Sequence, residues 1–378
     1  MTSPHEPPTA TSLRAHGPQE LVALVPYCLG FHPADSLVAL EFGTPGPGGG
    51  RPLSGGLRVD LPVSPAPGDV AAATGPLLAV LRRDVRPGSQ VHLLVLDPDA
   101  RLREGVLTPG DRAAATVRHV LADLGGGPAG PAPAEVLLVT ADRWRSLTCH
   151  RPCCPPGGAP RDGAGAGRVT AEAVGRGLAP AADRAGVLPP TAPHGPERLA
   201  AAAAARRRAR RAPAGPALVA AFDAAVEARL GSRVAQVPDA AWCGRVLAGL
   251  ADTGVRDAVL LSGARGPVTE RARAAVLHPG RAPGAAGGDA VDLIDRALAE
   301  ELDPVRASAA AAVAVDVARH AVDRSAAGAW AVAAWLHWQC GASAPAGGCA
   351  QRALELDPSH RLAGLVGQAV RLGLRPSR

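Results

Sequence analysis

The sequence predicts an α/β unit in the first half of the chain and an all-helical unit in the second half. Apolar runs at residues 36–42, 57–62, 91–97 and 135–140 have the length and spacing of strands. Segments with helical spacing separate the last three runs, and strand signals fade beyond residue 160. The first half should therefore form a mixed sheet, with an antiparallel hairpin followed by parallel βαβ units.

Each element follows from a local pattern. The apolar spacing of "QELVALVPYCLG" is that of a short helix, and the glycine-proline loop between the first two strands is typical of a hairpin. In the second half, "ALELDPSHRLAGLVGQAVRLGL" predicts a helix with Asp357 as its cap and Pro358 at its first position. The expected segments are a disordered tail (1–18), an α/β domain (19–145), a Cys/Pro/Gly-rich connector (146–190) and a helical domain (191–378).

Strand direction suggests where a ligand would bind. If the first strand pairs antiparallel with the second, its start shares an edge with the ends of the other three strands. Open α/β sheets bind ligands at this carboxyl edge. The candidate ligand-binding residues are Tyr27, His32, Asp35, Ser36, Arg58, Asp60, Asp97, Asp142 and Trp144.

Several of these residues also have ordinary structural explanations. Asp35 and Ser36 are typical of a turn in which side chains accept backbone hydrogen bonds. Arg58 and Asp60 suit a surface ion pair. Asp97, with Asp99, suits either a divalent ion with oxygen ligands or the turn that follows a strand, and we favour the turn.

The stretch "WRSLTCHRPCCPPGG" is the other candidate site, and we expect it to lie beside the carboxyl edge. Cys149, His150, Cys153 and Cys154 offer the atom types that zinc binds, although two adjacent cysteines suit one ion poorly. A reactive thiol is a second interpretation. A packed turn, with the cysteines as small apolar residues, is the interpretation we favour. No other cofactor is expected.

Composition excludes several classes of function. All 40 basic residues are arginine, so lysine Schiff-base chemistry and a lysine phosphate loop are excluded. The net charge of +6 comes from arginines and acids spread along the chain, so no nucleic acid is expected as a partner. The N-terminus lacks the pattern of a signal peptide, and charges interrupt the most apolar stretch, so we expect a cytoplasmic protein without membrane spans.

The motifs "LVPYCLGFHPADSLVAL", "LRVDLP", "WRSLTCHRPCCPPGG", "AEAVGRG" and "ALELDPSHRLAGL" resemble an actinobacterial family, domain of unknown function 4192 (DUF4192). The resemblance runs in order from about residue 19 to 376. It implies a bacterial, cytoplasmic protein of no established activity. Here Arg145 and Leu147 follow Trp144, where the family commonly has an aromatic residue.

No recognisable catalytic set emerges from the sequence. We therefore expect a non-catalytic or regulatory binding protein, which contacts a small polar ligand or a protein partner. The alternative is a hydrolase-like enzyme that uses Asp60, Asp97 and Asp142 at the carboxyl edge.

Overall fold

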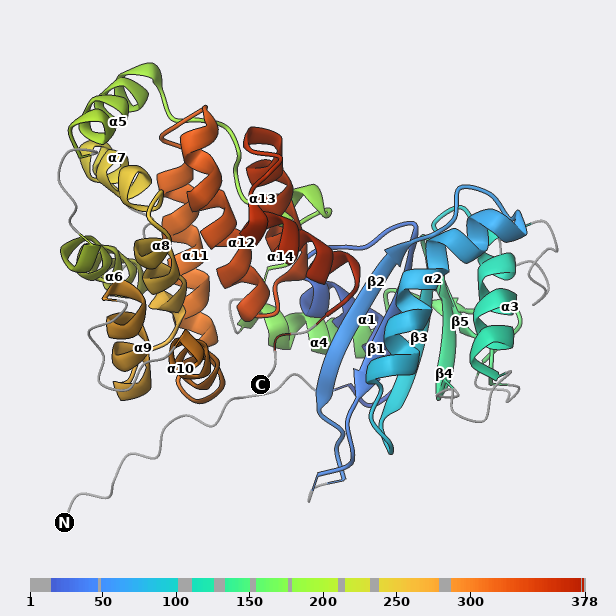
Figure 1. The fold of residues 1–378 in the computed structure, drawn as a ribbon. Coiled ribbons are helices and arrows are strands. Elements are labelled where there is room, and N and C mark those ends of the chain that lie inside the picture. Colours follow the sequence, from blue (N-terminus) through green and yellow to red (C-terminus); the bar gives the residue numbers. More distant parts are fainter. Residues whose placement is uncertain are drawn as a thin grey trace, which may run out of the picture. The chain divides into compact units, whose positions relative to one another are not determined.

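The computed structural model describes residues 15–46, 49–100, 111–125, 133–149, 154–175, 179–209, 215–231, 238–278, 287–374 and 376. The chain divides into two compact units, Met1–Val187 and Leu188–Arg378. The first unit contains a mixed sheet and the second is mostly helical, which confirms the predicted fold class at this level (Figure 1).

Six strands form the sheet of the first unit, in the order β2-β1-β3-β4-β5-β6. β1 pairs antiparallel with both β2 and β3, whereas β3 and β4 are parallel. β5 and β6, which the sequence did not predict, continue the sheet in antiparallel fashion. The strands are β1 (Ser36–Phe42), β2 (Leu53–Asp60), β3 (Gln90–Leu96), β4 (Glu135–Val139), β5 (Arg143–Ser146) and β6 (Ala159–Pro160).

Only one pair of neighbouring strands has the predicted βαβ arrangement among the described residues. α3 (Arg112–Gly125) connects β3 to the adjacent parallel strand β4. α2 (Pro67–Asp84) connects β2 to β3, but β1 lies between these two strands. β1, the hairpin partner of β2, therefore separates β2 from β3, so these two strands do not pair with each other.

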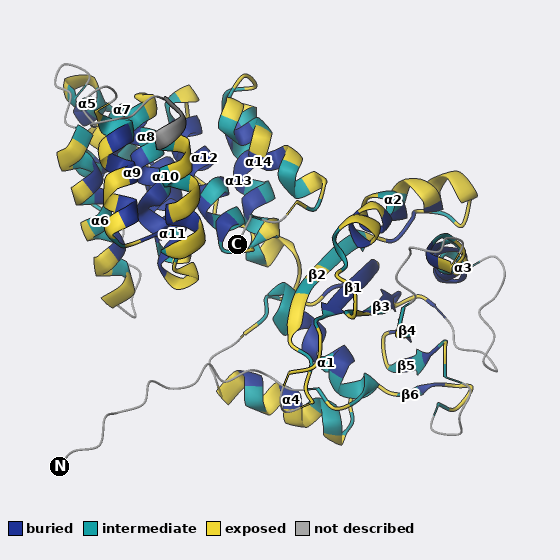
Figure 2. Cartoon of the chain, turned by 60° about the horizontal axis from the view of Figure 1, so that its bottom comes forward, coloured by how far each residue is buried: buried dark blue, intermediate teal, exposed yellow. Residues whose placement is uncertain are grey.

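Helices cover both faces of this sheet (Figure 2). α2 and α3 pack on the face that carries Leu37, Leu93 and Leu138. α1 (Pro18–Leu29) packs on the opposite face, which carries Val38 and Leu94. Because successive residues of a strand point to opposite faces, the continuous apolar runs of β1, β3 and β4 fill both cores.

The Cys/Pro/Gly-rich segment contributes structure to the same unit. It contains β6, α4 (Ala164–Gly175) and a short 3-10 helix, η1 (Ala185–Val187). α4 packs against α1, where Arg168 donates to both carboxylate oxygens of Glu20 at 3.1 and 2.6 Å.

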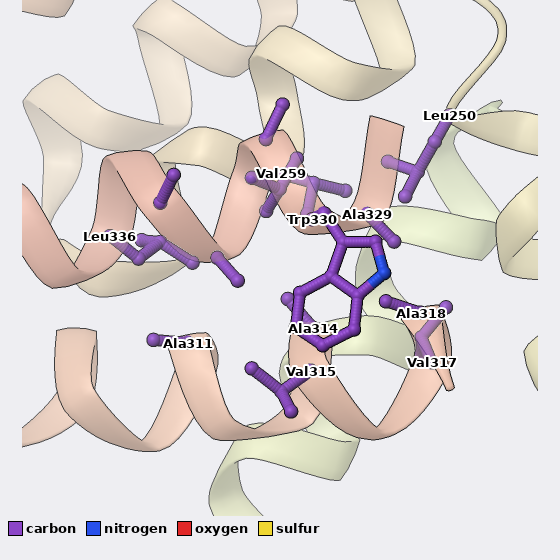
Figure 3. Packing of buried hydrophobic residues seen from close by; sticks show 14 of the residues in the cluster. Leu250, Val259, Ala311, Ala314, Val315, Val317, Ala318, Ala329, Trp330 and Leu336 are labelled. Atoms are coloured by element: carbon purple, nitrogen blue, oxygen red, sulfur yellow. The ribbon is translucent and has the colours of Figure 1, made fainter. Parts of the chain in front are cut away.

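Small residues dominate the core of the helical unit. The indole of Trp330, 2% exposed, packs among side chains that include Ala314, Val317 and Leu250 (Figure 3). The helices are α5 (Pro196–Ala209), α6 (Gly215–Gly231), α7 (Ala240–Gly249), α8 (Thr253–Leu260), α9 (Pro267–Leu277), α10 (Gly287–Glu300), α11 (Pro304–Ala318), α12 (Ala327–Gln339), α13 (Ser343–Leu356) and α14 (Arg361–Arg371), with short 3-10 helices η2 (Leu261–Gly263) and η3 (Arg324–Ala326).

Two features fix how these helices approach each other. A Cβ on Gly244 of α7 would lie 2.1 Å from the backbone oxygen of Ala202 in α5, so this crossing requires glycine. Asp223 of α6 pairs with the buried arginines Arg273 of α9 (2.6 Å) and Arg306 of α11 (3.5 Å). Its carboxylate therefore connects three helices.

The predicted start of the C-terminal helix is wrong. α13 ends at Leu356, and Asp357 forms a turn in which its carboxylate accepts from the Ser359 N–H at 3.1 Å. α14 begins at Arg361, and the His360 side chain caps it by accepting from the Ala363 N–H. The helix therefore begins at Arg361 rather than at Pro358, about one turn later than predicted. Among the helices that the structure describes, none has the length and apolar character needed to cross a bilayer.

Candidate functional site

The candidate site lies at the carboxyl edge of the sheet, where the strands meet as predicted. In the register of β1, Ser36 is opposite Asp60 of β2 on one side and Leu96 of β3 on the other. Leu96 is in turn opposite Val139 of β4. The start of β1 and the ends of β2, β3 and β4 therefore share one edge.

Asp97 and Arg112 form a bidentate ion pair at this edge. Asp97 follows β3, and its side chain is only 2% exposed. Arg112 begins α3 and donates through Nε to Oδ2 at 3.1 Å and through Nη2 to Oδ1 at 2.9 Å. These hydrogen bonds, together with one that Arg112 donates to Asp35, hold the pKa of the Arg112 guanidinium above its usual value. The bidentate geometry fixes a buried carboxylate at the end of the strand.

Asp35 and Asp99 complete what we call the rim cluster: Asp35, Asp97, Asp99 and Arg112. The Asp35 carboxylate also pairs with Arg112. Its backbone has a φ of 46°, the one positive φ at a non-glycine residue in the described ranges, and aspartate tolerates this conformation. The Asp99 N–H donates to Asp97 at 3.2 Å. One oxygen from each of the three carboxylates lies within 4.8 Å of the others.

Ser36, Arg58 and Asp60 form a second group on the other side of the same edge. Arg58 Nε donates to Ser36 Oγ at 2.9 Å, and Arg58 Nη2 pairs with Asp60 Oδ1 at 2.5 Å. In β1, Leu37 belongs to the core under α2 and α3, so alternation directs Ser36 and its partners to the α1 face. The predicted residues thus converge at one edge but form two groups, and the rim cluster lies on the α3 side.

The other four predicted ligand-binding residues lie apart from these two groups. Trp144 of β5 is buried in the core under α1. Asp142 accepts from the Thr140 hydroxyl at 3.3 Å in the turn before β5. Tyr27 is half-buried near the end of α1, and His32 is exposed, with its backbone N–H bonded to Ala181. In the described ranges, no hydrogen bond or ion pair joins these four side chains to the rim cluster.

Cys149, where the cysteine loop begins, does not lie beside the carboxyl edge, so the prediction is wrong at this residue. β5 runs antiparallel to β4 and carries the chain back, with Ser146 opposite Leu137. The described residues that follow β5, up to Cys149, therefore lie near Glu135, at the start of β4 and the opposite edge. Glu135 accepts from the Ser146 hydroxyl, and the Cys149 N–H donates to Ser146 Oγ at 2.9 Å.

His150 and Cys153 lie outside the described residues, so the zinc site of Cys149, His150, Cys153 and Cys154 stays a prediction. Cys154 itself is half-buried.

Sequence reasoning missed Arg112. A usable signal was present, because Arg112 directly follows Asp111, the predicted start of a crossover helix. The N-terminus of such a helix returns from the carboxyl edge of the sheet. Asp111 accepts from the Ala113 N–H at 2.8 Å, which fixes the first turn and positions the arginine.

The fold and site define a class of two-unit proteins: a mixed sheet with a charged rim in the first unit, and an alanine-rich helical second unit. The family model described as "Domain of unknown function (DUF4192)" matches residues 18–281 and 290–377. The chain belongs to this family, as the motifs predicted. Comparison with curated proteins and with solved structures gave no match.

Proposed function

We propose that the protein binds a small polar ligand and that the rim cluster holds a positively charged group of this ligand. One observation carries the proposal: three carboxylates have oxygens within 4.8 Å of each other, and two of them, Asp35 and Asp97, pair with Arg112. Counted over the four residues of the rim cluster alone, three carboxylates and one guanidinium leave an excess of two negative charges. An excess of this sign favours a cation at the edge where α/β sheets bind ligands.

The exposure of the three carboxylates suits this role. Asp97 is buried and held by Arg112, whereas Asp35 and Asp99 are exposed. A hard divalent cation binds oxygen ligands at roughly 2.0–2.6 Å, so two ligands of one ion lie up to about 5 Å apart. An organic ammonium group would use the same charge and similar spacing. Both kinds of cation therefore belong to the proposed ligand class.

The positions of three aspartates argue against the hydrolase-like alternative, which needs Asp60, Asp97 and Asp142 together at the carboxyl edge. Asp60 instead pairs with Arg58 in the group on the α1 face, and the Asp142 carboxylate accepts from the Thr140 hydroxyl in the turn before β5. Asp97 is therefore the one member of this set that belongs to the rim cluster. Binding of a protein partner by the helical unit, and the cytoplasmic location, stay predictions.

The proposal is tested by thermal melting of the full chain with Mg²⁺, Mn²⁺, Ca²⁺ or putrescine. A ligand that binds only the folded state raises the melting temperature. We expect such a rise for the wild type and its loss in Asp35→Asn and Asp99→Asn, since asparagine also tolerates the backbone of residue 35.

Asp123→Asn serves as the matched control. Asp123 is also paired with an arginine, Arg82, but it lies near the far end of α3. The control should keep the ligand-induced rise. Equal rises in all variants, or no rise with any of the four probes, would contradict the proposal.

A further inference from the structure

The helical unit contains a hollow of about 190 Å³, whereas the rim cluster belongs to the first unit. One wall is the chain segment that begins at Leu188, and the other is α13, with Trp330 of α12. A cavity of about 150 Å³ is large enough for benzene. The hollow therefore has room for a molecule with one ring and one small substituent.

Part of the lining is apolar and chemically inert. Trp330 and Cys349 are buried, and Leu188 contributes a branched side chain. Burial raises the pKa of the Cys349 thiol to about 12, so the thiol stays protonated near neutral pH. A neutral buried thiol packs like a small apolar group and does not attack a ligand.

The polar part of the lining presents a donor without an acceptor. Both oxygens of Glu355 are occupied, by Arg352 Nη1 at 2.8 Å and by Gln351 Nε2 at 3.2 Å. Arg352 Nε is buried, and no described atom accepts its hydrogen. A buried donor that has lost water and found no acceptor is destabilising, so an acceptor from a bound molecule would be favourable here.

We propose that this hollow binds a small monocarboxylate with an aromatic or branched apolar body, with the carboxylate on Arg352 and the body against Trp330 and Cys349. A carboxylate supplies the acceptor that Arg352 Nε lacks, whereas an ammonium group offers none. The volume limits the body to about one ring. This site does not depend on the rim cluster, and either proposal can fail alone.

Gly348 gives a variant that changes the hollow without weakening the helix. A Cβ at position 348 would lie 2.9 Å from Leu188 Cδ2, so alanine there displaces Leu188 and reshapes the hollow. Gly347 precedes it in α13, and its Cβ would meet Val370 Cγ1 at 3.4 Å, an ordinary contact. Both substitutions raise helix propensity. Gly347→Ala is therefore the matched control for Gly348→Ala.

The test is calorimetric titration of the full chain with benzoate, and with benzylamine as the probe of opposite charge. We expect benzoate to bind the wild type and Gly347→Ala at one site. Gly348→Ala and Arg352→Gln should each lower the affinity by roughly tenfold or more. Benzylamine should neither bind there nor compete.

Three results would overturn the proposal: no benzoate binding by the wild type at millimolar concentration, equal benzoate affinity in all variants, or benzylamine binding as well as benzoate. Gly348→Ala keeps the test valid if Arg352→Gln fails to fold.

Discussion

Replacing Arg112 with methionine tests whether the rim cluster depends on its arginine. Methionine preserves helix propensity but removes the guanidinium and its hydrogen bonds of 3.1 and 2.9 Å to Asp97. The Asp97 side chain, 2% exposed, would then remain buried. Among the described residues, the Asp97 carboxylate would then keep one hydrogen-bond donor, the Asp99 N–H at 3.2 Å.

The expected cost follows from burial. Removing one partner of a fully buried ion pair costs about 3–5 kcal/mol, because the other charge is left uncompensated. The Arg112 side chain is 24% exposed, so in the variant water can enter part of the space of the guanidinium and reduce this penalty. The contact with the exposed Asp35 adds less than about 1 kcal/mol. We expect Arg112→Met to lower the free energy of unfolding by about 2–3 kcal/mol.

The assay is urea unfolding, followed by hydrogen exchange in peptides from β3 and β4, because a chain of two units need not unfold in one transition. Arg82→Met is the control, since its partner Asp123 pairs with a guanidinium that is 52% exposed, and it should cost less than about 1 kcal/mol. The double variant Arg112→Met/Asp97→Asn should be more stable than Arg112→Met, because it removes the buried charge. A loss below about 0.5 kcal/mol for Arg112→Met, or a double variant less stable than the single one, would refute the reasoning.

Three further predictions concern the helical unit. In urea unfolding, Asp223→Ala should lower the free energy of unfolding of the helical unit by about 3 kcal/mol, because it removes a carboxylate from the buried arginines Arg273 and Arg306. A cost under about 1 kcal/mol would show that water or other acids compensate. Gly244→Ala should lower the melting temperature despite its better helix propensity, whereas Gly167→Ala, with open space around its Cβ, should not; equal effects would contradict the close crossing of α5 and α7. Burial lowers the pKa of His320 from 6.5 to about 4, so the unfolded chain takes up a proton first and stability should fall by up to about 3 kcal/mol as pH drops from about 6.5 to 4. His320→Gln should flatten that pH dependence, and an unchanged slope would assign it to other groups.

The sequence predicted those parts of the sheet where the local pattern is strong. The run at 36–42 coincides with β1, and the run at 135–140 differs from β4 by one residue. The placement of β1 between β2 and β3 was not predictable, because it depends on which edges pair rather than on any local pattern. β5 was missed since "RWRS" is short and mostly polar, and its pairing with β4 comes from tertiary context.

The difference between local pattern and strand pairing also explains which site residues were predicted correctly. Strand direction alone brought Asp60 and Asp97 to one edge, as predicted. The two faces of that edge were not separated in the prediction, although the alternation of Ser36 and Leu37 contained the information. The position of Cys149 was predicted wrongly because the four residues of β5 run antiparallel to β4 and carry the chain back, and the predicted connection had no such strand.

In α14, apolar spacing was a poor guide to burial. Val366 is buried, but Leu365 and Leu372, which follow the same apolar spacing, are exposed. The spacing identified the helix, while the neighbour α13 covers only part of its apolar face.

Amide chemical-shift mapping tests the central claim, that the carboxyl edge holds a cationic ligand, most directly. Spectra of the ¹⁵N-labelled chain would be recorded during titration with Mg²⁺ and with putrescine. We expect saturable shifts at Asp35, Asp99 and Ala113, with the Thr148 and Cys149 amides at the opposite edge unchanged. Shifts confined to the opposite edge, or none at the rim cluster up to millimolar ligand, would contradict the account.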